Sequence, residues 1–449
     1  MAGQGALPPS PGGLMRSGRA LFHDPLSYMM ATWREYGDVV GYRLLRQRFY
    51  LVAHPEAIKH VLQDNNRNYD KNNLDYRVLR QLLGAGLLTS EGDFWLRQRR
   101  LIQPMFHRER VMGWGNLMSE STLAMLADWR QRAQSGQPLD VAAEMGRLTL
   151  KIVARALFSF DIERHADSVT NNLAIANRHF GRLSLITVLL PFFPTPENLR
   201  FQAAVRKLDR IARELIRARR ADGGAQDDLL AVMLAARDES GRPAMSERQL
   251  RDELLTLLLA GHETTANALA WTWFLLARNP EVEANLHDEL DGVLGGALPT
   301  TADLPRLPYT RMVIEESMRL YPPAWGVSRH AVGDDEVGGF YLRRGTNVFL
   351  CTYITHRHPE YWPEPERFEP RRFESAQIER RPRYAYFPFG GGPRLCIGNQ
   401  FALVEAQMVL ATVAQHYRLR LVPNHPIEPQ PLVTLRPRYG VLMTLHPRR

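Results

Sequence analysis

The segment FPFGGGPRLCIGNQ, Phe387 to Gln400, is the most informative part of this sequence. It places three successive glycines and a proline just before Cys396, one of only two cysteines in 449 residues. Glycines let a backbone approach closely and turn its N–H groups toward an anion. The helix expected after Cys396 has a positive N-terminal end, which lowers the pKa of a cysteine. The segment therefore predicts a thiolate at position 396 that is either a nucleophile or a metal ligand.

The surroundings of Cys396 in the sequence favour the metal ligand. A nucleophilic thiolate needs a histidine base, and none lies nearby in the sequence. A zinc site needs paired cysteines or histidines, which are missing too. A lone thiolate suits an iron whose other positions are filled by a porphyrin. The alternative, a buried inert cysteine, is the interpretation we favour for Cys351, in an apolar strand.

The composition is that of an ordinary globular protein, 45% hydrophobic and 23% charged. No Gly/Ser linker or repeat divides the chain, so we expect one domain over 21–449 after a flexible lead-in over 1–20. Two cysteines cannot form a disulfide framework, which favours a reducing, cytoplasmic setting. The start has no signal peptide, and polar residues at the centre of 254–277 exclude a transmembrane anchor there.

The net charge of +9 raises the question of nucleic acid binding. No basic run interleaved with aromatic residues and no zinc-finger spacing is present, so we expect no nucleic acid partner. The arginines are scattered on helical faces such as 206–220. They form either a solvated surface or a positive surface that docks an acidic protein partner.

Helical periodicity dominates the middle of the chain and predicts a mainly α fold with a small β component. Helices are expected at 115–133, 148–158, 197–219 and 304–320. Strands are expected at 39–45, 49–52 and 346–351, and a terminal hairpin at 432–435 and 441–445.

One expected helix is much longer than the others. Ser246 with Gln249 forms a capping box, and Asn279-Pro280 supplies the stop. The run between them is about 33 residues, or about 50 Å at 1.5 Å per residue, which would cross a whole domain. Because it is apolar on nearly all faces, we expect it to be buried.

The cysteine segment fits the pattern F-x-x-G-x-x-x-C-x-G and resembles that of cytochrome P450s, the haem-thiolate monooxygenases. The resemblance extends over most of the chain and implies the family fold, with the long helix crossing above the haem. It implies haem b (iron protoporphyrin IX) with Cys396 as the axial thiolate and with Phe389 and Gly390 beside it. It also implies that one oxygen atom of O2 is inserted into a C–H bond of a hydrophobic substrate. A separate ferredoxin or flavodoxin with an NAD(P)H reductase would supply the electrons.

The stretch Ala260-Gly261-His262-Glu263-Thr264-Thr265 lies midway along the long helix. A glycine loosens a helix, and a threonine hydroxyl can bond back to an earlier carbonyl. By resemblance this is the oxygen-activation segment, with Ala260 and Gly261 against the haem, Thr264 as the hydroxyl next to dioxygen and Glu263 as the acid. Without the resemblance, the stretch would be a polar kink in a core helix. His262 is assigned no role.

Two further groups of charged residues match the family. Glu316 and Arg319 share a helical face, and with Arg367 of Pro365-Glu-Arg-Phe368 they are expected to form a buried structural network. Residues expected to hold the haem propionates follow the same resemblance, since guanidinium groups suit carboxylates. They are Trp95, Arg99, Arg329 and Arg394.

The substrate pocket is predicted from family positions that are nearly all apolar. These are Val78, Leu79, Leu82, Ala260, Ala324, Trp325, Val327 and Tyr439. The absence of charge among them favours a terpenoid, a carotenoid or a fatty acid, and 320–329 looks like the same stretch of soluble bacterial carotenoid and terpenoid hydroxylases. The apolar segment 189–196 is either an entrance for such molecules or part of the core.

Three alternatives remain open from the sequence. A peroxygenase would use hydrogen peroxide and no electron donor, but such enzymes tend to replace the acid–threonine pair. A haem sensor would keep Cys396 without needing a proton relay. A helical binding protein without haem would use the glycine segment only as a turn.

Overall fold

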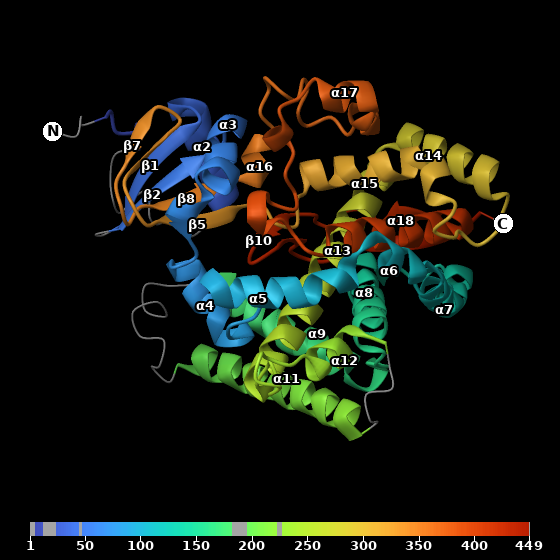
Figure 1. Cartoon of the computed structure of the whole chain (residues 1–449). Coiled ribbons are helices and arrows are strands. Elements are labelled where there is room, and N and C mark those ends of the chain that lie inside the picture. Colours follow the sequence, from blue (N-terminus) through green and yellow to red (C-terminus); the bar gives the residue numbers. More distant parts are fainter. Residues whose placement is uncertain (1–4, 12–23, 45–46, 182–194, 222–226, 449) are drawn as a thin grey trace. The chain divides into compact units, whose positions relative to one another are not determined.

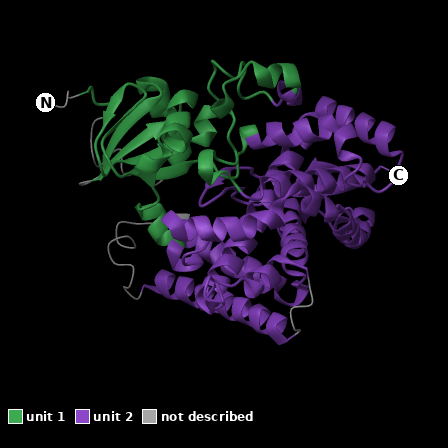
Figure 2. Cartoon of the chain, viewed as in Figure 1, with its two compact units in different colours: residues 1–79, 319–367, 374–396 green, residues 80–318, 368–373, 397–449 purple. Residues whose placement is uncertain are grey.

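The computed structural model describes residues 5–11, 24–44, 47–181, 195–221 and 227–448. Helices dominate among its elements, and strands gather in small sheets (Figure 1). Contacts group the chain into two compact units, each assembled from separated segments (Figure 2). The first contains 1–79, 319–367 and 374–396, and the second contains 80–318, 368–373 and 397–449. The single domain expected over 21–449 stays a prediction.

The first unit is built around a five-stranded sheet in the order β1-β2-β8-β5-β3. Its strands are β1 (Val39–Leu44), β2 (Gln47–Val52), β3 (Tyr69–Asp70), β5 (Val327–Ala331) and β8 (Asn347–Leu350). Strands β2 and β8 run parallel, and the other neighbouring strands run antiparallel. The strands expected at 39–45, 49–52 and 346–351 are therefore present, within one or two residues at each end.

Short helices and a β-hairpin complete the first unit. They are α2 (Pro25–Tyr36), α3 (Pro55–Lys59), α16 (Thr352–Thr355), α17 (Ser375–Glu379), β6 (Asp335–Val337) and β7 (Phe340–Leu342). Aliphatic residues that alternate along the strands, such as Val348 and Leu350, are fully buried in its core. Helix α4 (Leu74–Leu83) begins in this unit and ends in the second.

The described part of the N-terminal lead-in is bonded to the first unit. Gly41 donates its N–H to the carbonyl of Pro9 at 2.8 Å, and Tyr341 donates to Ala6 at 2.9 Å. Backbone groups of residues 5–11 therefore extend the contacts of the neighbouring strands, which a purely flexible lead-in would not do. The rest of the predicted lead-in, 1–4 and 12–20, lies outside the described residues.

The second unit is mainly helical. Its helices are α5 (Gly92–Ile102), α6 (Arg108–Gly113), α7 (Gly115–Ser135), α8 (Val141–Phe158), α9 (Glu163–Gly181), α11 (Pro196–Ala221), α12 (Leu229–Ala235), α13 (Glu247–Arg278), α14 (Pro280–Leu294), α15 (Pro308–Leu320) and α18 (Asn399–His416). Its strands are β4 (Leu139–Asp140), β9 (Tyr417–Leu421), β10 (Pro429–Pro431), β11 (Leu435–Pro437) and β12 (Leu442–Pro447). The four helices predicted from periodicity are all present, with their ends shifted.

Helix α13 is the long helix expected from the sequence. It has 32 residues, and its capping box is present: Ser246 Oγ accepts from Gln249 N–H at 3.3 Å, and Gln249 Oε1 accepts from Ser246 N–H at 2.7 Å. Gly261 lets α8 approach closely, because a Cβ at this position would lie 2.7 Å from Val153 Cγ2. Of the 32 residues of α13, 24 are buried, as its all-round apolarity predicts.

The predicted terminal hairpin is wrong in its pairing. Strand β11 pairs with β10, and β12 pairs with β9 and β4 instead. The alternating burial of β9, with Tyr417 and Leu419 inward, offers β12 a long apolar partner that the short β11 does not. The hairpin was expected because its two segments lie close together in the sequence, but the structure pairs each of them with another strand.

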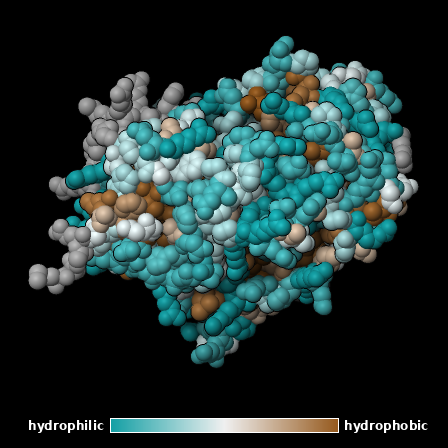
Figure 3. Space-filling view, turned by 90° about the horizontal axis from the view of Figure 1, so that it is seen from above, coloured by the Kyte–Doolittle hydropathy of each residue, from teal (hydrophilic) through white to brown (hydrophobic). Residues whose placement is uncertain are grey.

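No helix among the described residues is long and apolar enough to cross a membrane. The face shown in Figure 3 is mostly hydrophilic, with small and separate apolar patches. Large hydrophobic side chains that are exposed, such as Leu7 and Leu199, are few among the described residues.

Candidate active site

The cysteine segment closes in a tight turn within the first unit. Cys396 is exposed, and its N–H donates to the carbonyl of Phe389 at 3.0 Å. Gly390 and Gly392 have φ values of 71° and 61°, in the left-handed region that favours glycine. The sequence therefore folds back on itself locally and presents the thiol at the surface of the unit.

The glycines also allow a close approach of two backbones. A Cβ at Gly392 would lie 1.8 Å from the carbonyl oxygen of Leu62, and a Cβ at Gly391 would lie 2.3 Å from the ring of Tyr384. The Tyr384 hydroxyl accepts from Gly392 N–H at 3.1 Å and donates to Gln63 at 3.0 Å. Tyr384 thus holds the glycine turn in place, a role that the motif alone did not reveal.

His356 anchors the start of the same segment. Its Nε2 accepts from Phe387 N–H at 2.9 Å, and its ring stacks on Tyr386 at 4.9 Å. Its carbonyl accepts from Arg319 at 2.8 Å, and Arg319 also donates to the carbonyls of Pro365 and Arg367 at 2.7 and 3.1 Å. The fully buried Arg319 therefore holds the chain that follows α16, and His356 joins this chain to the segment before Cys396.

The structure corrects the expected place of Arg367, the third residue of the predicted network with Glu316 and Arg319. The Arg367 side chain is 57% exposed rather than buried and pairs with Glu364, while its backbone carbonyl accepts from Arg319. In the second unit, Arg372 Nε lies 3.4 Å from the fully buried carboxylate of Glu316, which also accepts from Glu369 N–H at 2.9 Å. A buried carboxylate requires a compensating cation, and Arg372 supplies it.

The sequence contained a signal for this correction. The pattern P-x-R-F occurs twice within a few residues, as Pro365 to Phe368 and as Pro370 to Phe373. The second copy carries Arg372. The sequence alone offered no physical reason to choose between the two copies.

The arginines expected at the haem propionates lie in both units. Arg329 is 7% exposed, and it donates to the carbonyl of Ser328 at 2.9 Å and to the Tyr76 hydroxyl at 3.4 Å. Among the described residues it pairs with no carboxylate. A buried guanidinium with neutral partners fits an anionic group such as a propionate, so this part of the first unit suits the cofactor.

The remaining propionate candidates are less buried. Arg394 ends the short helical turn 392–394 and is partly exposed. On α5, Trp95 and Arg99 are one turn apart and partly exposed, and Arg99 Nε donates to Gln103 at 3.4 Å. An exposed thiol after a glycine turn, with Arg394 two residues before it and the buried Arg329 in the same unit, is a donor set that fits haem.

The threonines of α13 bond back along the helix. Thr264 Oγ1 donates to the carbonyl of Ala260 at 2.7 Å, and Thr265 Oγ1 donates to that of Gly261 at 3.3 Å. This is the back-bonding expected from the sequence. It orients the Thr264 hydroxyl along the helix.

Glu263 is held by residues far away in the sequence. Its Oε1 accepts from Asn177 Nδ2 of α9 at 2.6 Å and from Thr434 Oγ1 at 2.6 Å. Asn267 in turn donates to Thr434 at 3.1 Å. Burial lowers the pKa of Arg436, and the charge of Glu263 opposes this decrease. None of these partners could be found from the sequence, since no local motif includes them.

Two other titratable groups lie on or beside α13. Burial lowers the pKa of His262 to about 4, so its imidazole is neutral near pH 7. Burial raises the pKa of Glu405, on α18, well above its usual 4.5 and favours its neutral form. No sequence motif points to this residue.

The predicted pocket residues differ in their surroundings. Val78 and Leu82 are buried, and Leu79, Ala324 and Val327 are partly buried. Ala260 is exposed on α13. The Trp325 ring packs on Phe349 at 5.1 Å, against a core cluster of the first unit. Tyr439 is 49% exposed, with Arg438 over its ring. Residues 189–194 of the predicted entrance lie outside the described residues.

The cytochrome P450 family matches residues 8–443, nearly the whole chain. The chain belongs to this family. It is 40% identical over 431 residues to a cyclooctatin synthase from Streptomyces melanosporofaciens, covering 95% of this chain and 93% of that protein. It is 37% identical to a cyclooctat-9-en-7-ol 5-monooxygenase of the same organism, covering 90% and 87%.

A solved structure of a cytochrome P450DA heme domain matches with a TM-score of 0.88 at 29% identity. The match covers 100% of this chain and 99% of that one. The chain therefore has the cytochrome P450 fold and binds haem. It is a monooxygenase that acts on a hydrophobic small molecule, with O2 and electrons from a redox partner. The expected family, fold class and reaction class are confirmed.

Proposed function

We propose that this cytochrome P450 hydroxylates a terpenoid. The observation that carries the proposal is the 40% identity, over 95% of the chain, to cyclooctatin synthase, a terpenoid-modifying enzyme. The predicted pocket residues support it, since none carries a charge that would favour a fatty acid carboxylate. Of the three substrate classes expected from the sequence, a compact apolar terpenoid agrees best with both observations.

The cofactor is proposed to be haem b, with Cys396 as the axial ligand of its iron. Support comes from the exposure of the thiol and from the glycine turn, where Phe389 and Gly390 keep the backbone compact. Arg329, Arg394, Arg99 and Trp95 would bind the propionates, because guanidinium and indole N–H groups suit carboxylate oxygens. When bound, haem supplies the activation of dioxygen and the transfer of oxygen to carbon.

The proposed proton donors are Thr264 and Glu263. The Thr264 hydroxyl is oriented by its 2.7 Å bond to Ala260, so its oxygen keeps lone pairs free to accept a proton from the acid. Both short bonds to Glu263 converge on Oε1, and they fix the orientation of its carboxyl group. An acid beside an alcohol can pass protons one at a time to an oxygen atom above them.

A ferredoxin or flavodoxin with an NAD(P)H reductase is the proposed electron donor. The net charge of +9 supports an acidic partner, because opposite charge accelerates encounter. Two free cysteines support a reducing, cytoplasmic setting. If the partner is acidic, the rate of its reduction of the enzyme falls as ionic strength rises.

The experiment is a spectral titration of the haem-loaded enzyme with terpenoid alcohols and hydrocarbons, a carotenoid and fatty acids of 12 to 18 carbons. A terpenoid should shift the Soret band at lower concentration than the other classes, and it should be hydroxylated when ferredoxin, reductase and NADPH are added. A preference for the fatty acids would contradict the substrate class. Loss of the red-shifted carbon monoxide spectrum in Cys396→Ser, but not in Cys351→Ser, would support the assigned ligand.

A further inference from the structure

Helix α3 runs directly into a π-helical turn (the π-turn), His60–Asp64. The π-turn closes with a hydrogen bond in which Asn65 N–H donates to the carbonyl of His60, five residues back, at 2.8 Å. Turns of this kind are rare and are frequently found at functional sites. Such a turn persists only where other contacts stabilise it, and here those contacts come from Asp335.

One carboxylate oxygen of Asp335 holds both ends of the π-turn. Asp335 Oδ2 lies 2.9 Å from His60 Nε2 and accepts from Asn65 Nδ2 at 3.0 Å. The Tyr69 hydroxyl donates to the same oxygen at 2.6 Å. Burial tends to raise the pKa of Asp335, but the hydrogen bonds from Tyr69 and His60 outweigh burial and lower that pKa, so the carboxylate is ionised near pH 7. An ionised carboxylate only accepts, so all three side chains donate to it, and bonds to a charged acceptor are the strong ones.

The π-turn contacts the glycine turn of the cysteine segment. The carbonyl oxygen of Leu62 would lie 1.8 Å from a Cβ at Gly392, so the two backbones touch only because this residue is glycine. The next side chain of the π-turn, Gln63, accepts through Oε1 from the Tyr384 hydroxyl at 3.0 Å. That hydroxyl in turn accepts from Gly392 N–H at 3.1 Å. A backbone contact and a chain of two hydrogen bonds therefore join the π-turn to the residue four positions before Cys396.

The glycine turn transmits its position to the thiol. The carbonyl of Gly392 accepts from Leu395 N–H at 3.1 Å, and the carbonyl of Phe389 accepts from Cys396 N–H at 3.0 Å. A displacement of Gly392 therefore displaces the thiol as well. Tyr384 is buried, and burial raises the pKa of its hydroxyl, which stays neutral and can both donate and accept.

We propose that the π-turn supports the thiolate ligand, Cys396, and that Asp335 and Gln63 are positioning residues for it. Asp335 stabilises the π-turn, and the bond from Tyr384 to Gln63 transmits the position of the π-turn to the glycine turn. Residues that orient a metal ligand without binding the metal affect how firmly the metal is held and tune its properties. Here they would keep the sulfur bound as a thiolate rather than as a thiol. The proposal rests on the proposed function only for the identity of the ligand.

The first test removes the Tyr384 hydroxyl in the haem-loaded enzyme. Tyr384→Phe takes away the acceptor of Gly392 N–H, so hydrogen exchange at this amide should become faster. The red-shifted band of the carbon monoxide complex should be lost about tenfold faster than in the native enzyme at a temperature below unfolding, as expected for a residue that orients a metal ligand. Tyr50→Phe is the matched control and should behave as native. Both tyrosines are 3% exposed, and the Tyr50 hydroxyl also makes a hydrogen bond, to the carbonyl of Tyr341 at 2.9 Å.

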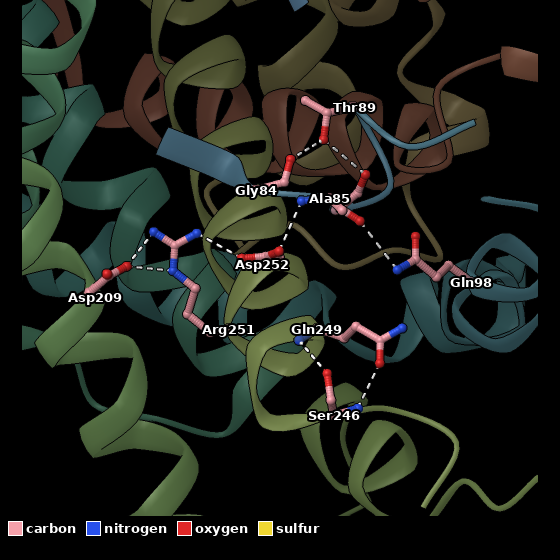
Figure 4. A network of polar contacts seen from close by, with 10 residues as sticks. Gly84, Ala85, Thr89, Gln98, Asp209, Ser246, Gln249, Arg251 and Asp252 are labelled. Carbon is pink, nitrogen blue, oxygen red and sulfur yellow. Dashed lines mark hydrogen bonds and ion pairs between the residues drawn. The ribbon is translucent and has the colours of Figure 1, made fainter. Parts of the chain in front are cut away.

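The second test uses two substitutions of Gln63. Gln63→Leu removes the acceptor of the Tyr384 hydroxyl and should accelerate the loss of the red-shifted band, whereas Gln63→Glu keeps an acceptor oxygen and should behave as native. Gln249→Leu, in the second unit, is the matched control and should leave the rate unchanged. Gln249 is also partly buried, and its Oε1 accepts from Ser246 N–H at 2.7 Å (Figure 4). A native rate in Gln63→Leu would overturn the part assigned to Gln63.

The third test acts on the π-turn itself. In Asp335→Asn the two ends of the π-turn lose the charged oxygen that they share, so hydrogen exchange at the Asn65 amide should become faster. The reduction potential of the iron should become more positive, because a thiolate that is held less firmly donates less charge to it. Asp334→Asn is the matched control, since the neighbouring Asp334 is exposed and accepts from the Tyr341 hydroxyl at 2.8 Å instead. Native exchange and a native potential in Asp335→Asn would contradict its positioning role.

The outcomes distinguish positioning from a general effect on stability. A native rate of band loss in Tyr384→Phe would overturn the proposal, and so would equal acceleration in Tyr384→Phe and Tyr50→Phe. Cys396→Ser separates the proposal from the proposed function. If Cys396→Ser lacks the red-shifted band while Tyr384→Phe is native, the ligand assignment stands and the positioning role fails. A red-shifted band that survives in Cys396→Ser would overturn both. None of these measurements depends on turnover of a terpenoid.

Discussion

Asn177 of α9 donates a 2.6 Å hydrogen bond to the carboxylate of Glu263 on α13. The two residues are 86 positions apart in the sequence, and Thr434 bonds the same carboxylate oxygen from the other end of the chain. The proposed acid is therefore held by two residues that belong to no recognisable motif. This relationship makes the orientation of Glu263 directly testable.

Replacing Asn177 should impair proton delivery more than substrate binding. In Asn177→Ala the Glu263 side chain loses one of two short bonds, each worth about 1.5–3 kcal/mol as a bond to a charged group, and rotates more freely. We expect a several-fold lower kcat, a nearly unchanged KM and more hydrogen peroxide released per NADPH consumed. Asn177→Asp would place a second carboxylate beside Glu263 and should shift the pH profile of kcat toward higher pH. An unchanged ratio of product to NADPH in Asn177→Ala would argue against a positioning role.

Substitution of Thr264, in the proposed proton relay, can distinguish a monooxygenase from a peroxygenase. Thr264→Ala should reduce product formed with ferredoxin, reductase and NADPH about tenfold or more, because a general acid–base group contributes about 10²–10⁴-fold. Turnover driven by added hydrogen peroxide should change little, since the peroxide brings its own protons. The neighbouring Thr265→Ala is the matched control. Efficient turnover of the native enzyme with peroxide alone, and none with the electron donor, would favour the peroxygenase.

Arg372 should be important for stability, and Arg367 should not. In Arg372→Leu the carboxylate of Glu316, which is 0% exposed, loses a neighbouring cation, and we expect a loss of about 3–5 kcal/mol in the free energy of unfolding. Arg367→Leu removes a side chain that is 57% exposed and should change stability by less than about 1 kcal/mol. Chemical denaturation of both variants measures the difference. Equal losses would mean that the side chain of Arg367 also supports the network.

Gly392→Ala should prevent haem from being retained. The added methyl group would lie 1.8 Å from the carbonyl oxygen of Leu62, at a residue whose φ of 61° already disfavours a side chain. We expect low haem content and a carbon monoxide spectrum without the red-shifted band. Gly339→Ala, also at positive φ but with nothing within 4 Å, is the control for backbone strain alone. A normal spectrum for Gly392→Ala would show that the turn can relax without loss of the ligand.

Glu253 should make the protein less stable as the pH rises toward neutrality. Burial raises the pKa of Glu253 to about 7, a rise that the Leu87 N–H opposes and the charge of Asp252 reinforces. Between pH 4.5 and 7 the folded state binds more protons than the unfolded state, so the free energy of unfolding falls as the pH rises. Glu253→Gln should abolish this decrease. The free energy of unfolding of the variant, relative to that of the native protein, should therefore grow with pH by on the order of 3 kcal/mol, with the full difference reached above pH 7. The exposed Glu247→Gln should show no such trend. Parallel curves for the native and Glu253→Gln proteins would contradict the raised pKa.

Local motifs predicted much of the fold and of the cofactor site. The capping box at Ser246 and the stop at Asn279-Pro280 gave the limits of α13, because caps act through bonds within one turn. The back-bond of Thr264 to Ala260 was also expected, since it needs only the helix itself. The pairing of β12 with β9, by contrast, depends on which distant strand offers the better apolar partner.

The sequence by itself determined the family and the long helix, and it carries the predictions of a thiolate at position 396 and of an acid–alcohol pair, since each rests on residues within a few positions of one another. Only the tertiary structure decided that Arg372 lies beside the buried Glu316 while the Arg367 side chain is exposed, that Asn177 and Thr434 hold Glu263, and that Asp209 pairs with Arg251. The physical reason is that buried charges and polar groups require partners, and folding can supply a partner from any part of the chain.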